Sequence, residues 1–168
     1  MDTKTTIMGS DGTATLNESL TPLEAIAAEF DAIDWNYTIT AKELQFYFPA
    51  RPFTGRCVAR VHGDQFVLIL ITLGLFVPEP ARPTVVHFAN RRNWNLLMGN
   101  LEMDEEDGEV RLRYTYPLVA GRLDGERAVG SIMQLCSIAG DVGPELLQAT
   151  AHVTKPSAGS DTGATELE

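Results

Sequence analysis

The sequence predicts an α+β fold in which helices pack on an antiparallel sheet, in the order α-β-β-β-α-β-β-α. Three segments repeat apolar residues with helical spacing, and the shorter segments between them are apolar or alternate as strands do. Tight turn motifs join several of the strands, as antiparallel neighbours allow. The chain has 168 residues, of which 44% are hydrophobic, and this suits one domain with a sizeable core.

The first predicted helix has a clear beginning. Thr21 suits the N-cap, Pro22 suits the first helical position, and Glu24 completes a Thr-x-x-Glu capping box. Apolar residues then recur at i, i+3, i+4 and i+7, so that one face of the helix meets a core. They are Leu23, Ile26, Ala27 and Phe30. Residues 33–39 alternate afterwards, which predicts an extended segment or a short connection.

Three strands are predicted next, around residues 44–48, 56–61 and 66–71, with a turn at 62–65 between the last two. The third strand is apolar on both faces. Such a strand is either central in a sheet that is covered on both sides, or its outer face meets a partner. Phe66, Leu68 and Leu70 are the partner-binding candidates on that outer face. Gly74 is expected to mark a bulge or the end of the strand.

A second helix is predicted to begin in the proline-rich segment 78–83 and to run to about Met98, because proline is tolerated only in the first turn. Gly99 is expected to end this helix as a C-cap. Trp94 and Met98 fall on the side of the helix opposite its core stripe, near His87 and Arg91. We expect this second apolar patch to bind a partner or a second copy of the chain.

The segment 90–93 of the same helix contains two asparagines around two arginines. One interpretation is an anion site, because an arginine offers a planar fork of donors. The favoured interpretation is structural. Asn90 and Asn93 lie beside the apolar arc, where they are expected to satisfy backbone groups of the neighbouring hairpin.

A hairpin is predicted from the alternation in 101–103 and 110–116 around a turn at 106–108, since aspartate-glycine is a strong turn signal. Its acidic residues are Glu102, Asp104, Glu105, Glu106, Asp107 and Glu109. A calcium loop of the EF-hand type is excluded by spacing, because counting from Asp104 puts glycine at the fifth position and threonine at the twelfth. The cluster is expected to be a solvated tip, or else a docking tip for a basic partner.

The last helix is predicted to begin near Asp124 and to continue past Pro144, where a kink is expected. The segments 1–17 and 154–168 are poor in large apolar residues and are predicted to be disordered. The folded domain is therefore expected to span 18–153.

Charge is distributed unevenly along the chain. The formal net charge is −10, with −6 in residues 1–41 and +4 in residues 42–100. An acidic total argues against direct nucleic-acid binding, although Arg51, Arg56 and Arg60 lie near aromatic residues. It is compatible with a basic protein partner, or with acidity that only confers solubility.

No catalytic or metal-binding constellation is recognisable. The two cysteines lie far apart in sequence and suggest buried, reduced thiols, and the three histidines have no metal-ligand spacing. We therefore expect no enzyme activity, no metal and no cofactor. The N-terminus does not read as a signal peptide, and the longest apolar run is too short to cross a membrane, so a cytoplasmic location is expected.

The helix–glycine–hairpin segment resembles the YbjN family, whose members are described as regulators of bacterial sensory transduction. The residues that carry the resemblance are Asn90, Asn93, Gly99, Asn100, Leu101, Glu102, Asp104, Asp107, Gly108, Arg111 and Arg113. The resemblance implies a compact α+β domain with a fold similar to class I type III secretion chaperones. It also implies that the domain dimerises and binds other proteins, and it brings no catalytic residues with it.

Two hypotheses from different classes follow. The first is a non-enzymatic, homodimeric, chaperone-like adaptor that holds a partner protein. The second is a regulator that senses a small ligand, or that docks a basic protein, such as one that binds nucleic acid, through the acidic hairpin. An enzyme that uses His87 is the weakest option.

Overall fold

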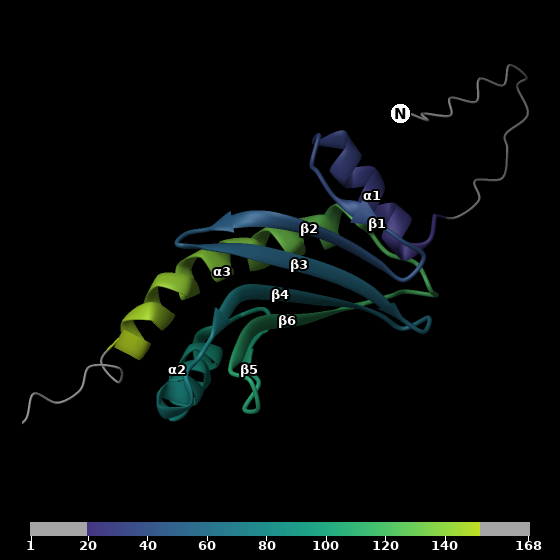
Figure 1. Cartoon of the computed structure of the whole chain (residues 1–168). Helices are drawn as coiled ribbons and strands as arrows, with labels where there is room; N and C mark the ends of the chain where they lie inside the picture. The colour runs from purple at the N-terminus through teal and green to yellow at the C-terminus, as the bar shows by residue number, and fades with distance from the viewer. Residues whose placement is uncertain (1–19, 152–168) are drawn as a thin grey trace, which may run out of the picture.

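The computed structural model describes residues 20–151 and has a six-stranded antiparallel sheet in the order β1-β2-β3-β4-β6-β5 (Figure 1). The elements in chain order are α1 (Pro22–Ala32), β1 (Thr38–Ile39), β2 (Glu43–Ala50), β3 (Phe53–His62), β4 (Phe66–Phe76), the short 3-10 helix η1 (Glu79–Ala81), α2 (Arg82–Asn95), β5 (Asn100–Met103), β6 (Glu109–Pro117) and α3 (Gly125–Ala151).

The predicted α+β class is confirmed, and the observed order differs from the predicted one by one early strand. That strand, β1, has two residues and pairs with the start of β2. The predicted disordered segments 1–17 and 154–168 lie outside the described residues.

The capping box predicted for the first helix is present. The hydroxyl of Thr21 accepts a hydrogen bond from the backbone N–H of Glu24 at 3.3 Å, and the Glu24 carboxylate accepts one from the N–H of Thr21 at 2.8 Å. The four apolar residues predicted to face the core are the buried residues of α1. The helix therefore begins where local sequence directs it and buries the face that its spacing defines.

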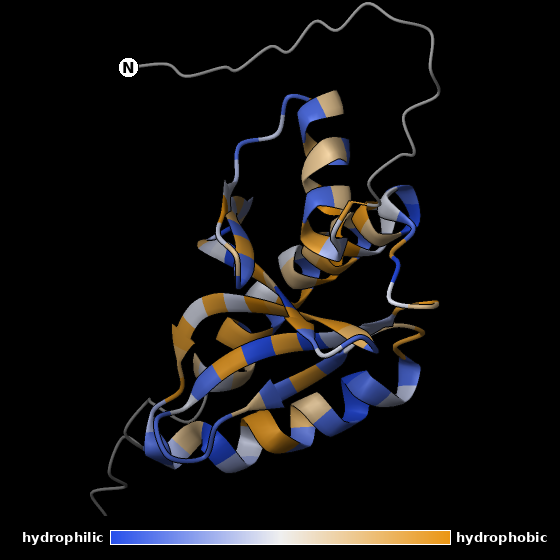
Figure 2. Ribbon diagram, turned by 90° about the vertical axis from the view of Figure 1, so that its right-hand side faces the viewer, coloured by the Kyte–Doolittle hydropathy of each residue, from blue (hydrophilic) through white to orange (hydrophobic). Residues whose placement is uncertain are grey.

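The sheet has one face covered by helices and one face open. In β4, Val67, Ile69, Ile71 and Leu73 point to the covered face and are at most 1% exposed, and the residues between them are exposed or half-buried. Figure 1 shows α3 behind the strands and nothing in front of them, and Figure 2 shows the hydropathy alternating along the strands. Among the described residues, the outer face of the third predicted strand is therefore uncovered.

An aromatic cluster fixes α1 against the sheet. Phe30 lies 5.2 Å from Phe46 between ring centroids, in an edge-to-face arrangement, and 6.3 Å from Trp35. Trp35 also contacts Phe46 edge-on at 5.6 Å. Such offset and edge-on pairs add to the stabilisation that comes from burying the rings.

Helix α2 is shorter than predicted. It ends at Asn95, and Leu96 is already extended, so the expected end at Met98 with Gly99 as C-cap is wrong. Gly99 instead has φ +77° in the turn that leads into β5. The cause lies in the tertiary structure, because the chain must reverse direction after α2 to place β5 beside β6.

Helix α3 begins as predicted, with the Asp124 carboxylate accepting a hydrogen bond from the N–H of Arg127 at 3.1 Å. It is continuous through Pro144 and spans the covered face of the sheet. Leu135 is 1% exposed, while Met133 and Cys136 are only half-buried. A long helix that crosses several strands does not keep one narrow buried stripe along its whole length.

Candidate protein-binding surface

One face of the sheet has no helix packed on it in the described residues. Strand register arranges it in four cross-strand rows, which we call the open face. The rows, each running from β2 or β3 toward β6 or β5, are Tyr47–Arg56–Thr72–Arg111–Glu102, Gln45–Val58–Leu70–Arg113–Asn100, Glu43–Arg60–Leu68–Thr115 and His62–Phe66–Pro117.

An apolar stripe runs along β4 through the middle of the open face. It consists of Phe66, Leu68 and Leu70, with Val58 beside it on β3. Phe66 is 41% exposed, and Leu68 and Leu70 are half-buried. The three candidates predicted on this strand therefore share one accessible surface, and burying it would remove apolar area from water.

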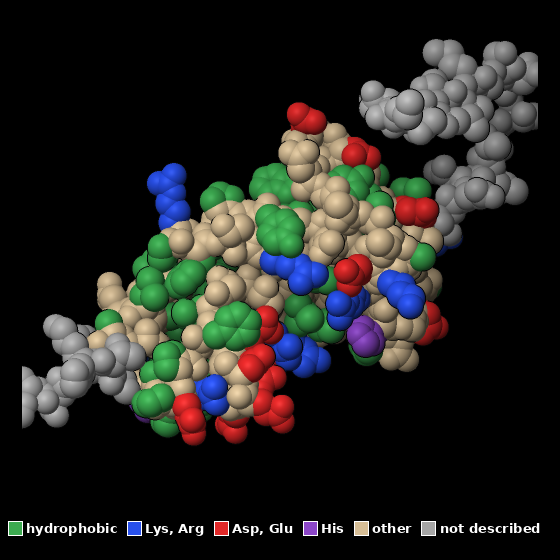
Figure 3. All heavy atoms as spheres, in the orientation of Figure 1, with side chains coloured by type: hydrophobic (Ala, Val, Ile, Leu, Met, Phe, Trp, Pro, Cys, Tyr) green, Lys and Arg blue, Asp and Glu red, His purple; other side chains and the backbone are tan. Residues whose placement is uncertain are grey.

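Arginines border the apolar stripe on both sides. Arg56 and Arg60 come from β3, and Arg111 and Arg113 come from β6. Sequence reasoning did not assemble these four, although their alternation with apolar residues within each strand is the signal that would place them on one face. Figure 3 shows blue side chains among green ones across the middle of this face.

Two glutamates partly neutralise these arginines. The Arg60–Glu43 pair has an N–O distance of 2.8 Å, and Glu102 lies 3.1 Å from Arg111 and 3.7 Å from Arg113. The four arginines and two glutamates give the open face a formal charge of +2, whereas the whole chain carries −10. The surface is thus opposite in sign to the rest of the protein.

Arg56 is held by a neutral group. Its guanidinium donates to the side-chain oxygen of Gln45 at 2.7 Å and 3.2 Å. The contact fixes the direction of the guanidinium without neutralising its charge.

A hollow of about 370 Å³ lies at one end of the open face. It is lined by His62, Phe66, Leu68, Arg113 and Thr115. A second hollow of about 640 Å³, lined by residues 96–100 together with Glu102 and residues 113–115, lies on the other side of Arg113. Arg113 therefore lies between the two hollows. Its guanidinium has five N–H donors, and its ion pair with Glu102 is a single long contact at 3.7 Å, so donors remain for a ligand.

The β5 edge of the sheet is closed by a side chain. Asn93 donates to the carbonyl of Leu101 at 3.0 Å and accepts from the N–H of Leu101 at 2.8 Å. This confirms the structural interpretation for Asn93. It is wrong for Asn90, which is exposed and forms no hydrogen bond with the hairpin in the described residues. A side-chain amide that occupies both groups of an edge residue blocks the addition of another strand there.

The patch predicted around Trp94 is divided by the structure. Trp94 is 89% exposed, but Met98 lies beyond the helix and packs against the core, so the two do not share a helix face. Leu97, just beyond the end of α2, is fully exposed, with a relative exposure of 102%. His87 and Arg91 are exposed on α2. The accessible apolar pair at this end of the molecule is Trp94 with Leu97.

Arg92 is not available as an anion ligand in the way the first interpretation required. Its guanidinium pairs with Glu145 of α3, at 3.1 Å between Nη2 and Oε1. The pair links the end of α2 to α3 and is partly exposed, which suggests a structural contact of modest strength.

The acidic hairpin is also divided. Glu102 belongs to the open face, while the carboxylates of Asp104 and Asp107 accept backbone N–H groups of the turn itself, each at 2.8 Å. Glu105 and Glu106 are exposed, and their side chains are the acidic groups of the tip that remain available. Figure 3 shows the red cluster at the lower edge of the molecule, where this hairpin lies.

The hairpin tip is anchored to the start of α2. Arg82 donates to the carbonyl of Glu105 at 2.8 Å and to that of Val77 at 3.2 Å, and the N–H of Val77 donates to the carbonyl of Gly108 at 2.8 Å. Gly108 has φ +82°, and a Cβ there would lie 2.3 Å from the Val77 oxygen, so only glycine fits. The conformation of the hairpin tip is therefore fixed by its contacts with Val77 and Arg82.

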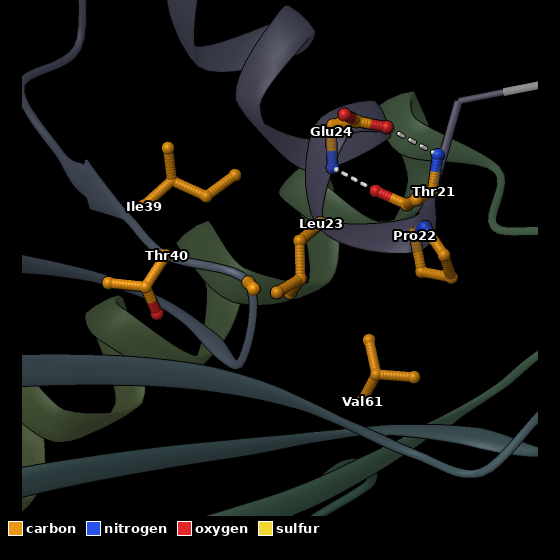
Figure 4. A pocket seen from close by; sticks show the side chains of 8 residues that line it. Thr21, Pro22, Leu23, Glu24, Ile39, Thr40 and Val61 are labelled. Atoms are coloured by element: carbon orange, nitrogen blue, oxygen red, sulfur yellow. Dashed lines mark hydrogen bonds between the residues drawn. The ribbon is translucent and has the colours of Figure 1, made fainter.

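A further hollow, of about 640 Å³, lies between the start of α1 and β1 (Figure 4). Its lining is mostly apolar, and its one carboxylate, Glu24, is already bonded to Thr21. The hydroxyls of Thr21 and Thr40 are also engaged locally, with the N–H of Glu24 at 3.3 Å and the carbonyl of Glu43 at 3.2 Å. These polar groups serve the local structure, and a ligand site needs polar groups that fix the orientation of the ligand.

The cysteines show no sign of nucleophilic chemistry. Burial raises the pKa of the Cys57 thiol well above its ordinary value, and it raises the pKa of the half-buried Cys136 thiol to about 12. A thiol that stays protonated is a weak nucleophile and a weak metal ligand. Within residues 20–151 no group of three His, Cys, Asp or Glu side chains could hold a metal ion, and no helix is long and apolar enough to cross a membrane.

Comparisons with known proteins agree with this architecture. The model of the YbjN family, described as "Putative bacterial sensory transduction regulator", matches residues 22–147. The crystal structure of YbjN from E. coli, described as "a putative transcription regulator", superposes with a TM-score of 0.53 at 14% identity. That match covers 77% of this chain and 92% of the other, and at this identity it shows a shared fold. No curated protein matches the sequence.

The family match spans the whole sheet and most of α3, including the helix–glycine–hairpin segment that carries the resemblance. The chain belongs to the YbjN family.

Proposed function

We propose that this protein is a non-enzymatic, chaperone-like adaptor that forms a homodimer and holds a partner protein on the open face of its sheet. The observation that carries the proposal is the apolar stripe of Phe66, Leu68 and Leu70, which no described element covers. Association with a partner would bury this surface, and burial of apolar area is the main driving force for such complexes.

The likeness to a family of regulators supports a binding role. A regulator acts by contact with other molecules, and the open face offers apolar contact area with charged groups around it, the general make-up of protein interfaces. In the described residues, by contrast, burial raises the pKa of both cysteine thiols, so neither is activated as a nucleophile.

We place self-association at the end of α2, at Trp94 and Leu97. The β5 edge is blocked by Asn93, and two open faces of like charge repel one another. An exposed tryptophan beside an exposed leucine is apolar surface that two identical subunits can bury against each other around a two-fold axis.

Site-specific photo-crosslinking in the native bacterium tests the adaptor role. A benzophenone amino acid replaces Phe66 on the open face, and in a second variant it replaces Leu147 on α3. The two positions are 41% and 38% exposed, so they differ in location and hardly in accessibility. We expect a discrete heterologous adduct from position 66 only, identified by mass spectrometry. Its loss in a Leu70→Asp background would show that the open face makes the contact.

Equal adducts from both positions, or none from position 66, would contradict the adaptor role. Light scattering after size-exclusion chromatography tests the dimer separately. We expect a dimer at micromolar concentration that becomes a monomer in the Trp94→Ser, Leu97→Ser double variant. A wild-type protein that is monomeric throughout would remove the homodimer from the proposal and leave the adaptor role standing.

A further inference from the structure

Building on the proposed adaptor role, we propose that the segment held on the open face is an acidic amphipathic helix. This occupant has an apolar stripe flanked on both sides by Asp or Glu. Three observations support it: the length of the open face along β4, the spacing of the arginines around the apolar stripe, and the sign of the charge on this face.

The length of the open face along β4 suits a short helix. From Phe66 to Thr72, the two ends of this face on β4, the strand spans about 20 Å at roughly 3.3 Å per residue. A helix of about 13 residues has the same length at 1.5 Å per residue. Such a helix, lying along β4, would place its apolar residues over Leu68 and Leu70.

The spacing of the arginines suits the width of a helix. They come from β3 and β6, the strands on either side of β4, and adjacent strands lie about 4.8 Å apart, so the two rows are about 10 Å apart at their backbones. An α-helix with its side chains is roughly 10–12 Å across. Carboxylates on both flanks of its apolar stripe would therefore meet Arg56 and Arg60 on one side and Arg111 and Arg113 on the other.

The hollow at Arg113 gives one carboxylate a defined seat. Its walls are the Phe66 and Leu68 side chains, and its polar groups are the Arg113 guanidinium, the Thr115 hydroxyl and the His62 imidazole. A carboxylate placed there would accept hydrogen bonds from the guanidinium, which is only loosely held by Glu102 at 3.7 Å. At this hollow we expect the protein to discriminate most strongly between a carboxylate side chain and the corresponding amide.

Charge also discriminates between occupants. A basic helix would be repelled by the four arginines. A second copy of the chain would bring either its own open face, which has the same sign of charge, or another surface that lacks a complementary apolar stripe. A nucleic acid would match the arginines, but it would have to approach a chain of net charge −10. The apolar stripe, together with its arginines, favours a polypeptide that is acidic and apolar at once.

Fluorescence anisotropy with the full-length protein and four labelled probes tests the inference. The first probe is a 14-residue peptide with a leucine stripe flanked by glutamates. The second has lysine for each glutamate, the third has serine for each leucine, and the fourth is a 14-nucleotide single-stranded DNA. We expect the first probe to bind more tightly than each of the others by about tenfold or more, with an affinity that falls as salt rises.

Charge reversal on the protein supplies the matched control. The Arg56→Glu, Arg113→Glu double variant is expected to lose about tenfold or more in affinity for the acidic amphipathic peptide. Arg127→Glu changes an exposed arginine on α3, on the other side of the sheet, and is expected to leave binding unchanged. Circular dichroism and a urea midpoint establish that each variant is folded.

The outcomes separate this inference from the proposed function. Equal or tighter binding of the lysine peptide, tighter binding of the DNA, or an unchanged affinity in the double arginine variant would overturn the acidic helix. If crosslinks from position 66 still reach a partner, the adaptor role survives with another kind of ligand. Failure of both experiments would remove the open face as a binding surface altogether.

Discussion

The two faces of the sheet are built from the same strands but differ in composition and exposure. Along β4, Ile69 points to the covered face and is 1% exposed, whereas its neighbour Leu68 points to the open face and is half-buried. The covered face is mostly apolar and packs against α1 and α3, with α2 covering β5. The open face combines an apolar stripe with arginines, which a protein interior does not tolerate without full pairing. The comparison shows that the covered face holds the core, whereas the open face leaves apolar and charged side chains accessible.

The strongest test of this comparison uses adjacent residues of one strand. Ile69→Ala should lower the free energy of unfolding by about 2–5 kcal/mol, because it leaves a cavity in the core. Leu68→Ala should lower it by about 1 kcal/mol or less, because that side chain is already partly in water. Urea unfolding measures both. Equal losses would show that the open face is buried in the purified protein, as in a self-associated form.

The next test concerns the β5 edge of the sheet, where Asn93 prevents another strand from pairing with Leu101. Asn93→Leu removes both hydrogen bonds to Leu101 and should lower the free energy of unfolding by about 1–3 kcal/mol. Asn90→Leu, at an exposed position on the same helix, is the matched control and should change it little. We also expect Asn93→Leu to aggregate more readily, because a strand edge becomes accessible. Similar losses for both variants would refute the edge-blocking role of Asn93.

A smaller effect is expected at the start of α1, which covers part of the core face. The hydrogen bond from the backbone N–H of Thr21 holds the pKa of the Glu24 carboxyl below its ordinary value of 4.5. The ionised form is thus favoured by folding, so its contribution is present above the unfolded pKa and disappears as pH falls through the lower folded pKa. The melting temperature of Glu24→Gln should therefore lie below that of wild type at pH 7 and approach it as the pH falls below the folded pKa. A difference that does not depend on pH would exclude the carboxylate as its cause.

The smallest effect on folding is expected at the acidic tip, which belongs to neither face. The Glu105→Lys, Glu106→Lys double variant should change the free energy of unfolding by less than about 0.5 kcal/mol, because both side chains are exposed. The informative measurement for this double variant is its binding to an oligolysine peptide. If the tip docks basic proteins, the wild type binds this peptide in a salt-sensitive manner and the variant does not. Equal binding by both proteins would leave the tip as a solvated turn.

Much of this fold is encoded locally. The capping box at Thr21, the alternation in β2, β3 and β6, and the aspartate-glycine turn each depend on residues within a few positions of one another. Such signals survive in the folded chain because nothing distant competes with them. The bridging role of Asn93 was also within reach of sequence, since a polar residue inside an apolar arc needs a partner.

Tertiary structure alone decided which face of the sheet stays open. Periodicity shows that β4 is apolar on both faces, but the covering of each face depends on where α1 and α3 pack, many residues away along the chain. The same holds for the four arginines, which lie on β3 and β6 and meet only because both strands flank β4. The end of α2 and the separation of Trp94 from Met98 were likewise set by the need to bring β5 beside β6. Local sequence fixes the period of an element, while contacts between distant segments fix which of its sides faces water.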